Sequence, residues 1–165
     1  MHYVPIVVMG VSGSGKTTVG TRLAEALGVD YAEGDEFHPP ANVAKMAAGT
    51  PLDDADREPW LDALAGWLAE RSGQGVVVTC SALKRIYRDR LRASAPDAFF
   101  LHLDLPRGEL ERRLAGRRGH FMPPSLLDSQ LATLEPLEPD EDGSTVDGTL
   151  SPEDLVREAV AALER

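Results

Sequence analysis

Cysteine and basic residues are scarce in this 165-residue chain. Cys80 is the only cysteine, so a disulfide within the chain and a zinc site built from several cysteines are excluded. The 17 Lys and Arg residues stand against 27 Asp and Glu residues and give a net charge of −10. Such an acidic chain is a poor candidate for general binding to nucleic acids or membrane surfaces.

Long apolar runs are missing as well. None approaches the roughly 20 residues that a membrane-spanning helix needs. The first apolar run, residues 4–9, follows no basic segment and does not resemble a signal peptide, so we expect a cytoplasmic protein. Hydrophobic residues nevertheless make up 42% of the chain. Together with the length, this predicts a single domain over residues 1–165.

Short apolar runs alternate with segments of helical periodicity along the chain. Strands are predicted at residues 3–9, 29–33, 76–80, 98–104 and 144–147. Helices are predicted at residues 17–27, 40–49, 53–72, 84–95, 107–117, 125–134 and 152–163. This alternation indicates an α/β fold with a parallel sheet covered by helices on both faces. A ligand should then bind beyond the carboxyl ends of the strands. The acidic, proline-containing residues 135–143 are expected to form a loop, and residues 135–142 receive no role.

Residues 10–17 match the motif G-x-x-x-x-G-K-[ST] in full, between a predicted strand and a predicted helix. The glycines let the backbone turn its N–H groups toward a phosphate, and the helix N-terminus adds positive charge. Lys16 can reach the β- and γ-phosphates, and Thr17 can ligate Mg²⁺. A glycine-rich turn without a ligand is disfavoured by the complete motif in this context. The predicted nucleotide-binding residues are Gly10, Val11, Ser12, Gly13, Ser14, Gly15, Lys16, Thr17 and Thr18.

Carboxylates gather where the second predicted strand ends. Asp35 is the candidate to accept the proton of an acceptor hydroxyl, and Glu33 is the candidate to hold a metal-bound water. His38 could bond a substrate hydroxyl or cap the helix that follows. On spacing alone, a solvated turn explains these residues equally well. A nucleotide site by itself does not distinguish a kinase from a hydrolase or a switch.

Positive charge is concentrated in one segment of the chain. Residues 84–118 contain 10 basic residues against 5 acidic ones. The segment predicts either a local anion site or two solvated helical faces.

Several further runs resemble the gluconokinase family, within the group that includes shikimate kinases and nucleoside-monophosphate kinases. The phosphate loop is shared by a very large superfamily, whereas the runs around His38, Pro59, Cys80 and His120 are much more specific. The matching runs cover nearly the whole chain and lie within residues 9–17, 34–39, 42–46, 49–52, 54–61, 80–84, 87–89, 117–121 and 127–134.

The resemblance implies ATP-dependent phosphorylation of D-gluconate at its 6-hydroxyl, with Mg²⁺, giving 6-phosphogluconate and ADP. It implies a three-layer fold with a five-stranded parallel sheet in the order 2-3-1-4-5, and commonly a homodimer. A helical substrate-binding region is expected over about residues 37–72, and a mobile lid over about residues 116–124. Arg117 of the lid would clamp the transferring phosphate, and Arg113 would cover the adenine ring.

Gluconate carries one carboxylate, which the planar fork of an arginine can bind through both oxygens. Arg57, Lys84 and Arg88 are therefore candidates to bind the substrate, beside Asp35 and His38. For each basic residue the alternative is a surface ion pair. Two rival functions remain open: a small-molecule kinase similar to shikimate kinase, and a non-catalytic nucleotide-binding switch.

Overall fold

A computed structural model describes residues 4–71, 73–116 and 124–164. The strands are β1 (Pro5–Met9), β2 (Asp30–Glu33), β3 (Val76–Thr79), β4 (Phe99–Asp104) and β5 (Gly143–Asp147). The helices are α1 (Lys16–Leu27), α2 (Pro40–Ala47), α3 (Asp54–Glu70), α4 (Arg85–Ser94), α5 (Arg107–Ala115), α6 (Pro124–Thr133) and α7 (Pro152–Leu163), with a short 3₁₀ helix, η1 (Gly34–Phe37).

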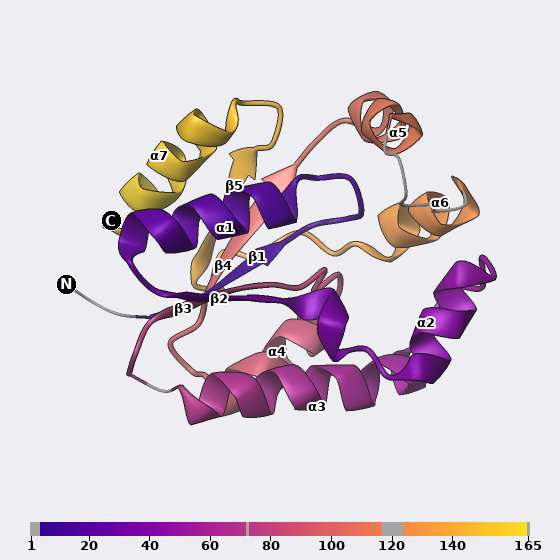
Figure 1. The fold of residues 1–165 in the computed structure, drawn as a ribbon, viewed down its shortest axis with the longest axis horizontal. Coiled ribbons are helices and arrows are strands. Elements are labelled where there is room, and N and C mark those ends of the chain that lie inside the picture. The colour runs from indigo at the N-terminus through magenta and orange to yellow at the C-terminus, as the bar shows by residue number, and fades with distance from the viewer. Residues whose placement is uncertain (1–3, 72, 117–123, 165) are drawn as a thin grey trace.

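The five strands form one parallel sheet in the order β2-β3-β1-β4-β5, as the resemblance implied. Strand β1 lies at its centre, and Val7 pairs with Val78 on one side and Phe100 on the other. All five residues of β1 are buried, as expected for a parallel strand covered on both faces. Figure 1 shows α1 and α7 over one face of the sheet and α3 and α4 over the other. The three-layer fold is confirmed.

Local chemistry explains where several helices begin and end. Helix α3 starts one residue later than predicted because Asp53 is its N-cap: the Asp53 side chain accepts from the Asp56 N–H, and the Asp56 side chain accepts in return. Helix α2 ends at Ala47, before Gly49, whose φ of 79° lies in the left-handed region. Ser151 caps α7 by accepting from the Asp154 N–H, as predicted.

Helix η1 follows β2, at the place where a solvated turn was one of the two alternatives left open by the sequence. Gly34 begins it against β3, where a Cβ atom would lie 1.7 Å from the carbonyl oxygen of Thr79. Trp60 Nε1 donates to the Gly34 carbonyl at 2.8 Å and ties η1 to α3. The segment that carries Asp35 is therefore fixed between the sheet and α3.

The lid predicted at residues 116–124 falls mainly on residues 117–123, which lie outside the described residues, as does its Arg117. Within the described ranges, no helix combines the length and the apolar character that crossing a membrane requires.

Candidate active site

The phosphate loop connects β1, the central strand of the sheet, to the N-terminus of α1. Gly10, Gly13 and Gly15 have φ angles of 150°, 86° and 91°, which a side chain would strain. Lys16 Nζ donates to the carbonyls of Gly10 at 2.9 Å and Val11 at 3.1 Å, so the ammonium group lies against the loop. Gly15 is the N-cap of α1, and no side chain caps this helix in the described structure. The N-terminus of α1 therefore presents its N–H groups to an anion, as phosphate binding requires.

A hydroxyl and a carboxylate meet beside this loop. Thr17 Oγ1 donates to Glu33 Oε2 at 2.9 Å. Glu33 also accepts from the Tyr31 hydroxyl at 2.6 Å and from Thr79 Oγ1 at 2.9 Å. Burial, followed by the Glu33 carboxylate, raises the pKa of Tyr31, so the phenol remains a donor. These contacts fix the Glu33 carboxylate beside the Thr17 hydroxyl.

Mg²⁺ prefers hard oxygen ligands and usually keeps several waters and substrate phosphates in its shell. Thr17 and Glu33 supply two such oxygens at the edge of the phosphate loop, and the donor set fits the ion. Among the residues that the structure describes, no group of three or more His, Cys, Asp or Glu side chains forms a metal cage. The ion would therefore depend on the nucleotide for its remaining ligands.

One cavity brings the phosphate loop together with the predicted acceptor side. Its lining includes Lys16 from α1, Asp35 from η1, His38 after η1 and Arg57 from α3. The side chain of Asp35 accepts no hydrogen bond from any described residue. A carboxylate in this state can take the proton of an incoming hydroxyl.

Arg57 lines this cavity, and only part of its guanidinium group is used in hydrogen bonds to described residues. The residue is only 9% exposed, and its Nη1 donates to the Leu52 carbonyl at 2.7 Å and to the Tyr87 hydroxyl at 3.1 Å. No hydrogen bond within the described residues uses its Nε or Nη2. These two groups can bind a carboxylate through two parallel hydrogen bonds.

Lys84 and Arg88 do not line this cavity. Lys84 Nζ binds Asp54 at 2.9 Å outside it. Arg88 was expected to be a candidate for binding the substrate, and the structure corrects this expectation. Its side chain is completely buried against Glu141, at 2.7 Å and 3.0 Å, and the Ala82 carbonyl, at 2.9 Å. The guanidinium donors of Arg88, which were expected to bind the substrate, therefore attach the acidic loop to α4.

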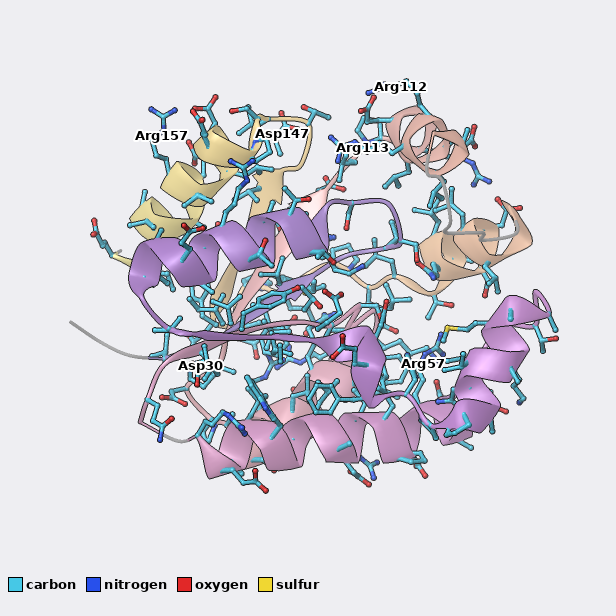
Figure 2. All side chains as sticks on the ribbon, in the orientation of Figure 1. Asp30, Arg57, Arg112, Arg113, Asp147 and Arg157 are labelled. Atoms are coloured by element: carbon cyan, nitrogen blue, oxygen red, sulfur yellow. The ribbon has the colours of Figure 1, made fainter. Side chains whose placement is uncertain are left out.

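Arg113 joins the phosphate loop to the loop after β5. Its Nη1 contacts the Ser14 carbonyl at 3.4 Å, its Nη2 donates to the Gly148 carbonyl at 3.1 Å, and its Nε binds Glu109 at 3.0 Å. Figure 2 shows Arg113 on the α5 side of the molecule and Arg57 on the α3 side. The two arginines thus belong to different parts of the site.

Gln130 is a site residue that the sequence reasoning missed. Its Oε1 accepts from the Ser12 N–H at 2.7 Å, and its Nε2 donates to Ser12 Oγ at 3.1 Å. Helix α6 is thereby attached to the phosphate loop, and Gln130 lines the cavity. The signal was present in the run Leu127–Leu134, which matched the family without receiving a role.

Comparisons with known proteins find relatives over most of the chain. The model of a family described as an AAA domain matches residues 6–137. A gluconokinase from Gluconobacter oxydans is 54% identical over 157 residues, covering 94% of this chain and 88% of that protein. The thermosensitive gluconokinase of Escherichia coli is 43% identical, covering 82% of this chain and 73% of that protein.

A crystal structure of a gluconokinase from Sinorhizobium meliloti superposes with a TM-score of 0.91 at 50% identity, covering 100% of this chain and 94% of that one. The chain belongs to the gluconokinase family. A shikimate kinase from Aquifex aeolicus, covering 98% of this chain and 96% of that one, reaches a TM-score of 0.63 at 19% identity. That likeness shows a shared fold alone. Membership of the gluconokinase family thus favours this function over the shikimate kinase-like and switch alternatives.

Proposed function

We propose that this chain transfers the γ-phosphoryl group of ATP to the 6-hydroxyl of D-gluconate, giving 6-phospho-D-gluconate and ADP. The observation that carries the proposal is a cavity lined both by Lys16 of the phosphate loop and by Asp35, His38 and Arg57. Gluconokinase relatives at 43–54% identity support the choice of substrate.

Each of these residues has a role that its chemistry suits. Phosphoryl transfer depends mainly on positioning and on neutralising charge. Lys16 and the N–H groups of the loop bind the phosphates, and Arg57 binds the gluconate carboxylate through Nε and Nη2. Asp35 takes the proton of the 6-hydroxyl as that oxygen attacks the γ-phosphorus. Mg²⁺, held at Thr17 and Glu33, would supply positive charge to the β- and γ-phosphates.

Further expectations, from the family resemblance and, for the cytoplasmic location, from the lack of a signal peptide, belong to the same proposal. Arg117 clamps the transferring phosphoryl group from a lid over residues 116–124, Arg113 covers the adenine ring, and the chain works as a cytoplasmic homodimer. Closure of such a lid excludes water, which otherwise competes with gluconate for the phosphoryl group.

A coupled assay of ADP release tests the proposed reaction. We expect rapid release with gluconate, and only background release with shikimate or with no acceptor. Release that does not depend on the acceptor would indicate a hydrolase, and preference for shikimate would reject gluconate as the substrate.

A further inference from the structure

The side-chain amide of Asn42 connects two parts of the acceptor side. Asn42 lies in α2 and is only 3% exposed. Its Nδ2 donates to the backbone carbonyl of Asp56 in α3 at 2.8 Å and lies 3.2 Å from Nδ1 of His38. The side-chain amide of a buried asparagine has an NH₂ end, which donates, and an oxygen end, which accepts. Its orientation is fixed when a neighbouring group can pair with only one of these two ends.

The Asp56 carbonyl fixes that orientation. A backbone carbonyl can only accept a hydrogen bond, so the atom of Asn42 that faces it must be the NH₂ nitrogen. The second proton of the same NH₂ group then points to His38 Nδ1. Nδ1 must accept, and the proton of a neutral imidazole must lie on Nε2.

The ring of His38 is also held in place. It stacks on Trp60 with 4.2 Å between ring centroids and 14° between planes. Trp60 is 1% exposed and is itself fixed through its bond to Gly34. His38 lines the acceptor cavity, and Nε2 has no hydrogen-bond partner among the described residues.

The surroundings of His38 shift the pKa of its imidazole in both directions. Burial lowers its pKa most, the Asp35 carboxylate of η1 acts against burial, and the Arg57 guanidinium of α3 acts with it. Lys45 of α2 and the Asp56 side chain of α3 bind each other at 2.7 Å. A proton on Nδ1 would also face the NH₂ group of Asn42, so the geometry opposes the imidazolium form.

We propose that Asn42 is a positioning residue, which holds His38 as the neutral Nε2–H tautomer so that Nε2–H donates to a hydroxyl oxygen of the sugar acid. The identity of the acceptor rests on the proposed function, whereas the tautomer does not. A neutral donor suits a polyol because it orients an uncharged oxygen without drawing the carboxylate away from Arg57.

Nitrogen-15 NMR of the ligand-free, ¹⁵N-labelled protein at neutral pH tests the tautomer directly. We expect Nε2 of His38 to resonate as a protonated nitrogen and Nδ1 as an unprotonated one, with the signals assigned by their loss in His38→Gln. A proton on Nδ1, an even mixture of tautomers or an imidazolium ring would overturn the proposal. This spectrum needs neither substrate nor an Asn42 variant, so it decides the tautomer even if the proposed reaction is wrong.

Asn42→Asp tests the consequence for substrate binding. The carboxylate can only accept, so it favours a proton on Nδ1 and removes the Nε2–H donor from the neutral ring. We expect the KM for gluconate to rise about 10-fold, the loss of one hydrogen bond, while the KM for ATP changes by less than about 2-fold. Gln74→Glu is the matched control, because it makes the same change at an exposed site. An unchanged gluconate KM in a folded Asn42→Asp whose tautomer has moved would refute the positioning role.

Discussion

Arg88 and Glu141 form an ion pair in which both side chains are fully buried, with Arg88 Nε 2.7 Å from Glu141 Oε1 and Nη2 3.0 Å from Oε2. Glu141 also accepts from Arg92 and from the Glu138 N–H. The pair joins α4 to the acidic loop before β5. This loop, which the sequence left without a role, is therefore part of the scaffold that supports the sheet edge.

Glu141→Gln should destabilise the protein strongly, because it leaves the Arg88 charge buried without a counter-charge. We expect a loss of about 3 kcal/mol in the free energy of unfolding, measured by urea denaturation. Glu138→Gln removes the same charge from a pair with Arg85 in which the Glu138 side chain is 55% exposed, and should cost less than about 1 kcal/mol. Equal stability of the two variants would contradict a structural role for the buried pair.

The same carboxyl group predicts a dependence of stability on pH. Burial opposes its ionisation, but the hydrogen bonds from Arg88 and from the Glu138 N–H, together with the charges of Arg88 and Arg92, outweigh burial and lower the pKa of Glu141 below its usual 4.5. The unfolded chain then binds this proton at a higher pH than the folded chain does, so stability falls as the solution is acidified through that range. The stability difference between wild type and Glu141→Gln should therefore shrink as the pH falls below the usual carboxyl pKa of 4.5, because the unfolded chain takes up the proton first. A constant difference would show that Glu141 does not titrate with folding.

Asp35→Asn should lower kcat with gluconate by about 10²-fold or more, because the amide cannot accept the hydroxyl proton. ATP binding should persist, since Asp35 lies on the acceptor side of the cavity. Steady-state kinetics with each substrate varied in turn measure both effects, and the neighbouring exposed Glu36→Gln is the control. A collapse of nucleotide affinity with kcat intact at saturation would assign Asp35 to the nucleotide side instead.

Arg57→Lys should raise the KM for gluconate by about 10-fold or more, because an ammonium group cannot replace a two-pronged guanidinium contact. The KM for ATP should stay within about 2-fold of wild type. Arg90→Lys provides the same change on the exposed surface of α4, where Arg90 pairs with Asp62 at 2.7 Å. If both variants bind gluconate like wild type, Arg57 is not the carboxylate ligand.

The sequence was most informative where a structure or a site is built from residues that are close together along the chain. The phosphate loop could be placed because strand, glycines, Lys16 and Thr17 follow one another, and the Ser151 cap because it acts within one helical turn. Side-chain partners distant in sequence could not be predicted. Arg88 was misassigned because Glu141 lies 53 residues away, and Gln130 was missed because Ser12 lies 118 residues away. The clamp by Arg117 remains a prediction from the family resemblance.

The position of phosphorylation tests the central claim most directly. We would incubate the protein with ATP, Mg²⁺ and D-gluconate and record the ³¹P NMR spectrum of the product without proton decoupling. Phosphorylation of the 6-hydroxyl gives a primary ester, whose phosphorus couples to the two protons on C6. We expect this signal to grow in proportion to the ADP formed. A phosphorus signal coupled to a single proton would place the phosphate on a secondary hydroxyl, and inorganic phosphate alone would show hydrolysis; either result would contradict the proposed gluconate 6-kinase activity.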